Sequence, residues 1–426
     1  MANNKKLLHQ VRQLSDKMVE LQAPIRVLDA VNWDKSVKQE FFKYKAERLP
    51  NITRDTYLQR DLGFDPENLR HAFSTLEQEI SRTIGQLNPM ARLMKRMCTE
   101  YRQVLRMIES RGTPDFHYYS VELYGHPHDV FHAGDPTLAE LAIMLEEPLV
   151  RLMDHSILPD DPKDIPAEQA LSYLDSVLNK SMPGLNARVI LSDGIVSDAA
   201  AGSDYIKLNK EVMFSQRELD LLEAHEGWIH VGTTQNGLAQ PYLTCLAKGT
   251  PSSTVTQEGL AVLTEIITLR STPRRLSKLI NRIRAVTLAT DGADFIEVFR
   301  YLRDKGLSEE DSYTIASRTF RGSLPDGLPF TKDLAYIKGF VLTYNFFRVA
   351  VQKGRIDLLP LLLVGKINLD DFRLISELHE QGIVVAPKFL PPHFQDLRGL
   401  VTWLSFGRFI GSLKFDQLEK DYSPLF

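Results

Sequence analysis

Apolar side chains recur every three or four residues along most of the chain, which is the spacing of a helix with one buried face. The pattern breaks at residues 22–24 and again at 88–89, where a proline interrupts it. Residues 112–136 are instead rich in Pro, Gly, His and Tyr, which indicates an irregular loop. Helices are therefore predicted over residues 1–48, 66–111, 138–154 and 167–179, and over most of the chain beyond residue 277.

Two short segments in the middle of the chain have the pattern of strands. Residues 187–192 are mostly apolar, and residues 204–209 alternate apolar and polar side chains as a half-buried strand does. Glycine-containing turn signals lie in the segment that joins them. We expect the two strands to form an antiparallel pair with a long connection.

Two capping-box sequences predict helix starts after the strands. Ser215 is followed three residues later by Glu218, so a helix is expected to begin there, with Gly232 as its natural stop. Thr254, followed three residues later by Gln257, predicts a second helix further along.

The combined pattern predicts a helix-rich α+β protein with a small antiparallel sheet and flanking helices. We place region boundaries near residues 180 and 300, because the strand pair and the two capped helices lie between them and the flanking segments are helical. We expect a helical N-terminal region over 1–180, a core with the strands and the capped helices over 181–300, and a helical C-terminal region over 301–426 that completes the cleft.

Composition narrows the class of protein. Among 426 residues, 51 Lys and Arg oppose 55 Asp and Glu, for a net charge of −4, so no nucleic-acid partner is expected. The chain has no run of 18 apolar residues and no signal-peptide pattern at its start, which favours a cytoplasmic protein without a membrane span. Two cysteines, Cys98 and Cys245, cannot build a disulfide scaffold or a cysteine zinc site. A metal would therefore need His, Asp or Glu ligands.

The most informative segment is the one that contains His225, Glu226 and His230. Zinc peptidases commonly carry two histidines four apart on one helix face, with a glutamate between them as the general base. A spacing of five places the histidines roughly 140° apart on a regular helix, too far to share a metal. A π-bulge restores the common face, and Gly227 is a suitable place for it.

A third ligand is available on the next predicted helix. Glu258 is expected in its first turn, and Gly259 would allow that helix to approach the metal helix closely. Glu265 lies on the same face and is either an outer acid behind a ligand or the alternative ligand. The competing interpretation makes His225 and His230 hydrogen-bonded core residues and Glu258 a helix N-terminal acid.

A second histidine group lies at residues 126–132. His128 and His132 have a spacing of four, which is a legitimate metal spacing on a helix. Pro127 and the surrounding loop pattern argue against a regular helix, so a loop lining the substrate cleft is the favoured interpretation.

Together, the two metal motifs carry a resemblance to a known family. The pairing of His-Glu-x-x-x-His with a downstream Gln-Glu-Gly-Leu-Ala at residues 257–261 is similar to that of the QEGLA-motif proteins, a family of bacterial chains. The eukaryotic members of that family are the microtubule-associated tyrosine carboxypeptidases. The similarity extends to residues 32–33, 123–125, 318–322 and 332–339.

The resemblance implies that His225, His230 and Glu258 bind Zn²⁺ and that Glu226 is the catalytic acid/base. It also implies a zincin-like metallopeptidase core that removes a C-terminal residue from a protein or peptide. The eukaryotic members bind microtubules with help from regions outside this core. Because this chain has no long basic N-terminal extension and a net charge of −4, we do not expect tubulin as its substrate.

A carboxypeptidase must also hold the free carboxylate of its substrate, and arginine offers a bidentate fork for this purpose. Arg321 is the first candidate, because Gly322 suggests a tight local backbone, and Arg318 is the second. Residues 204–209 could pair with an extended peptide by strand addition. Further candidates for binding the carboxylate or the oxyanion are Lys338, Tyr336, Tyr344 and Lys248.

Three functions stay open at this point. The first is a zinc carboxypeptidase, perhaps with an aromatic preference. The second is another zinc amide hydrolase, either an aminopeptidase or an endopeptidase. The third is a non-catalytic regulatory protein on a peptidase fold, which the intact Glu226 disfavours. The sequence leaves the oligomeric state open.

Overall fold

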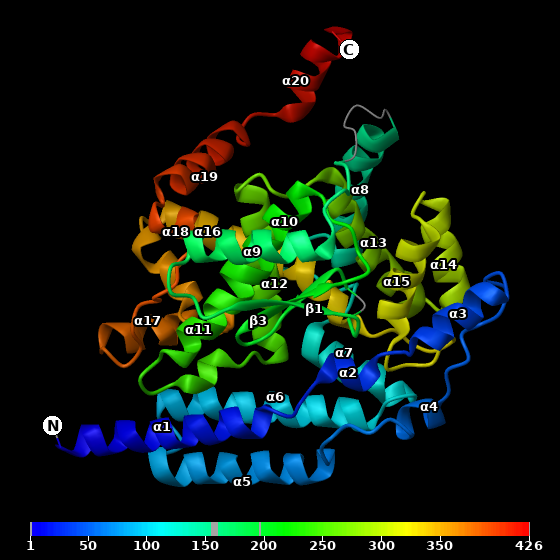
Figure 1. Cartoon of the computed structure of the whole chain (residues 1–426). Helices are drawn as coiled ribbons and strands as arrows, with labels where there is room; N and C mark the ends of the chain where they lie inside the picture. The colour runs from blue at the N-terminus through cyan, green and yellow to red at the C-terminus, as the bar shows by residue number, and fades with distance from the viewer. Residues whose placement is uncertain (1, 155–160, 196, 426) are drawn as a thin grey trace.

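The computed structural model describes residues 2–154, 161–195 and 197–425, and it is a helix-rich α+β fold (Figure 1). The predicted breaks in the N-terminal helices are confirmed: α1 ends at Gln22, and α6 begins at Pro89, where a missing N–H costs no hydrogen bond. Helices α1, α5 and α6 pack side by side. The N-terminal helices are α1 (Ala2–Gln22), α2 (Val27–Val31), α3 (Lys35–Lys43), α4 (Arg54–Leu58), α5 (Pro66–Ile84), α6 (Pro89–Glu109), α7 (Pro114–Tyr124), α8 (Leu138–Asp154) and α9 (Ala167–Ser181).

Helix α7 corrects the first half of the predicted irregular loop over residues 112–136, whereas the second half, residues 125–136, is irregular as predicted. Pro114 starts the helix, and its side chains Phe116, Leu123 and Tyr124 are buried at helical spacing. The Nδ1 atom of His117 lies 2.7 Å from the carbonyl oxygen of Pro329. These contacts with distant parts of the chain stabilise a helix that the local composition disfavours.

The sheet has three strands in the order β1 (Arg188–Ser192), β3 (Tyr205–Asn209) and β2 (Ala199–Ala201). Strands β1 and β3 are parallel, with Arg188 paired to Tyr205 and Ser192 paired to Asn209. The expected antiparallel pairing of these two strands is therefore wrong. Strand β2 runs antiparallel to β3, so the connection between β1 and β3 itself contributes a strand.

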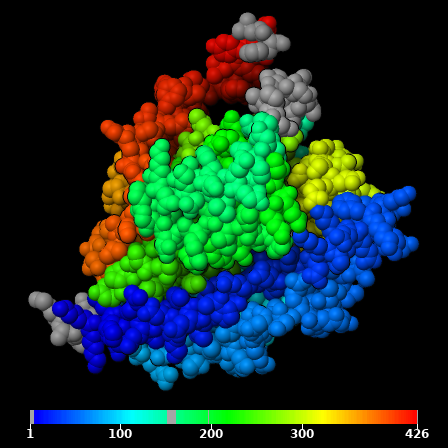
Figure 2. Space-filling view, in the orientation of Figure 1, coloured from blue at the N-terminus to red at the C-terminus, as the bar shows by residue number. Residues whose placement is uncertain are grey.

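This order also corrects the expectation that residues 204–209 bind an extended peptide. Strand β3 is the central strand, so both of its edges are already paired. Within the described sheet, the outer edges belong to β1 and β2. The sheet packs with α9 around a buried apolar cluster that includes Leu174, Ile206 and Trp228. In Figure 2 this part of the chain forms the green centre of the face, with α1 below it in blue.

The rest of the chain is almost entirely helical. The largest buried cluster joins side chains of α6, α12 and α16 with others from the N-terminal α1 and the C-terminal α19. In the part of the chain that the structure describes, no helix is both long and apolar enough to cross a membrane. The remaining α-helices are α10 (Gln216–Leu222), α11 (Gly232–Leu238), α12 (Pro251–Ile267), α13 (Pro273–Thr290), α14 (Phe295–Asp304), α15 (Glu309–Phe320), α16 (Ala335–Gln352), α17 (Phe372–Glu380), α18 (Pro392–Gln395), α19 (Arg398–Ile410) and α20 (Phe415–Tyr422). A π-helix (Glu223–Val231) joins α10 to α11, and short 3₁₀ helices span Thr244–Ala247, Thr331–Leu334, Ile356–Leu363, Leu369–Asp371 and Ser423–Leu425.

Helices α12 and α16 cross at two glycines. A Cβ atom on Gly259 would lie 2.0 Å from the carbonyl carbon of Gly339, and one on Gly339 would lie 1.9 Å from the carbonyl oxygen of Val255. Gly259 therefore allows a close approach to α16, and not to the metal helix as the sequence suggested. This contact fixes the position of α12 against α16, and α12 carries Glu258.

We expect Gly259→Ala to lower the free energy of unfolding by at least about 3 kcal/mol, because the added methyl group meets backbone atoms that cannot rotate away. Urea unfolding monitored by circular dichroism measures the change. Gly407→Ala is the matched control, since Gly407 lies inside α19 and nothing approaches within 4 Å of its would-be Cβ. That control should be neutral or stabilising by about 0.5–1 kcal/mol. Equal midpoints for the two variants would contradict the proposed crossing.

Candidate metal centre

A π-helix at residues Glu223–Val231 brings the two histidines together. Hydrogen bonds from residue i to i+5 place side chains five apart on one face, and the ring centres of His225 and His230 lie 4.9 Å apart. The predicted bulge is therefore present. A Cβ on Gly227 would lie 2.2 Å from Cδ2 of Leu178, so a larger residue here would force the Leu178 side chain of α9 to move. Gly232 is not a stop, because it keeps right-handed helical angles and the helix continues as α11.

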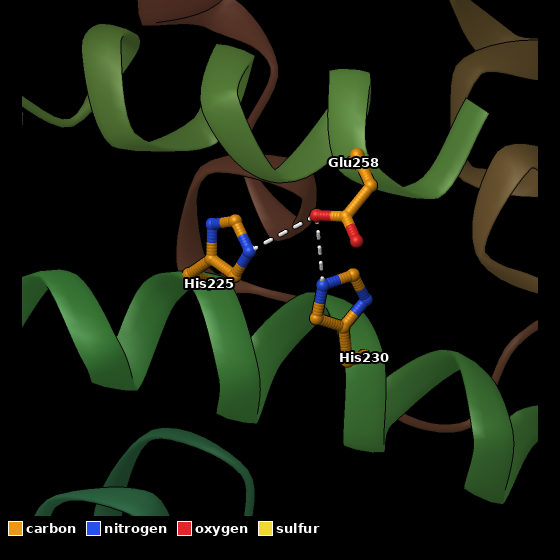
Figure 3. A group of neighbouring side chains, drawn as sticks. All are labelled: His225, His230 and Glu258. Atoms are coloured by element: carbon orange, nitrogen blue, oxygen red, sulfur yellow. Dashed lines mark ion pairs between the residues drawn. The ribbon is translucent and has the colours of Figure 1, made fainter. Parts of the chain in front are cut away.

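Glu258 joins the two histidines from α12 (Figure 3). Its Oε2 atom lies 3.3 Å from Nε2 of His225 and 3.5 Å from Nε2 of His230. These separations fit zinc, since ligands about 2.0–2.1 Å from a tetrahedral ion lie roughly 3.4 Å from one another. The same Oε2 atom is buried without a hydrogen-bond partner. The residues present therefore fit a metal ion with two nitrogen ligands and one oxygen ligand.

The close contacts within this group shift the pKa values of its members. Burial raises the pKa of Glu258, but the imidazoles of His225 and His230 beside its carboxylate outweigh burial and hold the pKa well below its usual range. Burial lowers the pKa of His225, but hydrogen bonds with Glu258 and Glu265 outweigh it and raise the pKa to about 10. Glu258 is thus ready as a carboxylate ligand, and a metal that binds His225 must displace a proton.

The start of α12 differs from the predicted one. The capping box is formed by Thr250 and Ser253, and α12 begins at Pro251. Thr254 lies inside the first turn, where its hydroxyl donates to the carbonyl oxygen of Thr250. Glu258 consequently lies about two turns into the helix. The competing interpretation of Glu258 as a helix N-terminal acid therefore does not apply, since the helix dipole acts within the first turn.

Glu265 lies directly behind His225. Its Oε1 atom is 2.6 Å from Nδ1 of His225, and Arg275 donates to both of its oxygens at 2.9 and 3.1 Å. Burial raises the pKa of Glu265, but Arg275 and His225 outweigh it and lower the pKa to about 2. Of the two alternatives for Glu265, this geometry matches the outer acid that orients a ligating histidine.

We expect Glu265→Gln to weaken zinc binding about 10- to 100-fold, because the imidazole of His225 loses its charged partner. Competition between the protein and a coloured chelator measures the affinity. Asp311→Asn is the matched control, since Asp311 is another cavity-wall carboxylate paired to a cation, Lys278 at 3.0 Å, without contact to a histidine. Unchanged zinc affinity in Glu265→Gln would remove the orienting role.

Glu226 lies beside the metal group on the wall of the same cavity. Its Oε2 atom accepts a 2.9 Å hydrogen bond from the backbone N–H of Ala201 in β2. Strand β2, which positions Glu226, was not predicted from the sequence. Its short alanine run carries no strand pattern, so the sequence offered no signal for it.

The cavity has a volume of about 1330 Å³ and is open to the outside. It extends between β2, the π-helix and α13, with the three candidate ligands in its wall. Ordinary small-molecule pockets have volumes of about 300–1,000 Å³, so this cavity has room for several residues of a peptide.

The candidate substrate residues fall into two groups. Tyr336 and Arg318 line the cavity, and the ring centre of Tyr336 lies 6.4 Å from that of His225. Arg321 and Lys338 are absent from its described lining, and Lys338 lies 3.2 Å from a carboxylate oxygen of Asp129. Tyr344 is also absent from it, whereas Lys248 lines the cavity. The wall also holds cations that the sequence did not single out, among them Arg282, Lys332 and Lys366.

The second histidine group is separate from the cavity. His128 contacts Asp291 at 3.2 Å and His132 contacts Asp135 at 3.1 Å, both on the surface. Neither residue is among the described residues that line the cavity, so the expected cleft loop is not confirmed there. In the described part of the chain, the group His225, His230 and Glu258 is the one in which three ligand atoms converge.

Comparison with known proteins now adds a family. No curated protein matches the chain. Residues 39–412 match the family model described as microtubule-associated tyrosine carboxypeptidase, and this span covers most of the 426 residues. The match includes the π-helix, the candidate ligands and Glu226. The chain therefore belongs to the microtubule-associated tyrosine carboxypeptidase family, a family of peptidases.

Proposed function

We propose that the protein is a zinc metallocarboxypeptidase that removes a C-terminal residue from a protein or peptide. The observation that carries this proposal is the position of Glu226, anchored by β2 on the wall of a peptide-sized cavity beside His225, His230 and Glu258. Membership of a carboxypeptidase family supports the direction of cleavage. We also propose that residues 181–300 form a zincin-like core between the two helical regions, since the sheet, the π-helix and α12 all lie in this segment.

In this proposal His225, His230 and Glu258 hold the zinc ion. The chemistry that zinc supplies when bound is Lewis acidity, which polarises a carbonyl group and makes water a stronger acid. Glu226 accepts the proton of the attacking water and passes it to the leaving amine. Because the N–H of Ala201 occupies Oε2 of Glu226, Oε1 is the oxygen left for this transfer.

Two further groups on the wall act on the substrate. Tyr336 is placed next to His225 and would donate its hydroxyl to the developing oxyanion. Strand β2 is an outer strand of the described sheet and its Ala201 contacts Glu226, so an extended peptide lying beside β2 would carry its scissile bond past Glu226.

A peptide library with varied C-terminal residues tests the proposal. We expect the zinc-loaded protein to release single C-terminal residues, detected by mass spectrometry. Cleavage inside the peptides, or loss of N-terminal residues, would instead assign the other amide-hydrolase classes. A zinc-loaded protein that leaves the whole library intact would favour the regulatory alternative.

A further inference from the structure

Three guanidinium groups gather near one carboxylate next to the cavity. Arg318 on α15 donates two 2.7 Å hydrogen bonds to the two oxygens of Asp333. Arg282 on α13 and Arg321 after α15 lie close enough to Asp333 that all three arginines hold its pKa far below the usual range, against the effect of burial. Asp333 balances one of the three positive charges, so the cluster is short of negative charge.

The spare donors of this cluster are buried and unsatisfied. The Nε atom of Arg282 and the Nε and Nη2 atoms of Arg321 are buried without hydrogen-bond partners. No described carboxylate lies within 4.0 Å of the Arg282 guanidinium, which lies over the ring of Tyr336. Burial, followed by the charge of Arg318, lowers the pKa of Arg282. Buried charges are normally paired, so this arrangement indicates an anion that arrives from outside.

Arg282 lines the same cavity as the metal group. Cζ of Arg282 is 4.9 Å from the ring centre of Tyr336, which is 6.4 Å from that of His225. Arg282 and His225 therefore both neighbour Tyr336. In a C-terminal dipeptide the terminal carboxylate lies one residue, about 3.8 Å along the chain, beyond the scissile bond. Because Arg282 and the three candidate ligands share one cavity, the terminal residue of a substrate bound at the metal can extend toward Arg282.

Two other arginines on this wall already have carboxylate partners. Arg275 pairs with Glu265 at 2.9 Å, and Arg318 pairs with Asp333. Arg321 lies behind the wall, with its Cζ 5.8 Å from the ring centre of Phe330. It can add positive potential but is not among the described residues that line the cavity.

Lys248 and Lys366 line the cavity, and no described carboxylate forms an ion pair with either of them. Burial lowers the pKa of Lys366 to about 8, so this lysine is partly neutral near neutral pH. A lysine also lacks the planar fork with which arginine binds a carboxylate through two hydrogen bonds. Arg282 is therefore the best-suited anchor.

We propose that Arg282 binds the terminal carboxylate of the substrate and is the residue that makes the enzyme specific for free C-termini. This inference rests on the proposed carboxypeptidase function. Arg321 adds positive charge near Arg282, and the Arg282 guanidinium packs over the ring of Tyr336. The substrate thus supplies the anion that the cluster lacks.

A pair of substrates tests the inference. The peptide that the wild-type protein trims fastest is prepared with a free C-terminal acid and with a C-terminal amide, and kcat/KM is measured for both. We expect Arg282→Met to lose on the order of 100-fold in kcat/KM on the acid and less than about twofold on the amide. The loss of kcat/KM on the acid should be smaller for Arg282→Lys than for Arg282→Met. Arg284→Met is the matched control, since Arg284 lies on the same helix, contacts Tyr301 and does not line the cavity.

Stability separates an anchor from a structural residue. Because no described carboxylate forms an ion pair with the buried Arg282 guanidinium, Arg282→Met should keep or raise the thermal midpoint of the substrate-free protein. If Arg282→Met keeps the wild-type ratio of kcat/KM on the acid to kcat/KM on the amide, the inference is overturned. If the Met variant does not fold, Arg282→Lys decides on the same ratio. A wild-type protein that trims no free C-terminus refutes the proposed function itself, and an intact wild-type activity with an unaffected variant refutes only the anchor.

Discussion

Replacing Glu226 with Gln is expected to lower peptide hydrolysis by about 10²- to 10⁴-fold while the protein keeps its metal. The amide oxygen of glutamine can still accept the hydrogen bond from Ala201, so the side chain keeps its place. What the variant loses is the carboxylate that takes up the proton of water. Steady-state kinetics on the best library peptide measures the first effect, and metal analysis of the purified variant measures the second.

Asp198→Asn provides the control for this substitution. Asp198 is an exposed acid that lines the same cavity, and its side chain makes no contact with the metal group. It should keep activity within about twofold, which shows that removal of one negative charge from the cavity is not enough to stop the reaction. If Glu226→Gln kept more than a tenth of the wild-type rate, Glu226 would not be the general base.

The metal group could be predicted from the sequence because its signal is local. His225, Glu226 and His230 lie within two turns of one helix, and the spacing of five requires the π-helix that the structure has. Glu258 lies on the next long helix, and its chemistry is that of a ligand wherever the helix begins. The error at the start of α12 therefore did not affect the choice of Glu258, because several Ser and Thr residues near position 250 can form alternative caps.

The contacts that could not be predicted join residues far apart in sequence. Gly259 meets Gly339, and Ala201 holds Glu226 across the sheet edge. A glycine shows that a close approach is allowed but not which element approaches. A strand of three alanines has no alternation of polar and apolar side chains, so its pairing depends on the neighbouring strand alone. Helix α7 could not be predicted for the same reason, because it is stabilised by contacts with residues far away in the sequence.

Net charge illustrates the same limit for the substrate. The chain carries −4 overall, yet the cavity wall holds the cations Arg282, Lys248 and Lys366 without carboxylate partners among the described residues. The total charge averages over a surface that the substrate does not touch, whereas binding depends on the charges that face the cavity. The overall charge of −4 is therefore no argument against an acidic substrate.

Zinc is expected to stabilise the wild-type protein against heat and to have no such effect on His230→Ala. A ligand that binds only the folded state stabilises it by about 4 kcal/mol when present at a thousandfold excess over its Kd. His230 is the suitable ligand to remove, because the pair of His225 and Glu265 behind the site stays intact. The measurement is the thermal midpoint of chelator-treated protein with and without added zinc.

His128→Ala is the matched control for this experiment. His128 belongs to the second histidine group and contacts Asp291 on the surface, so its removal should leave the zinc-dependent shift unchanged. A shift that survives in His230→Ala but disappears in His128→Ala would move the metal to the second group. A shift that is lost in His230→Ala alone ties the stabilisation to the site that also contains Glu258, because in the described chain no other His, Cys, Asp and Glu ligand atoms converge in this way.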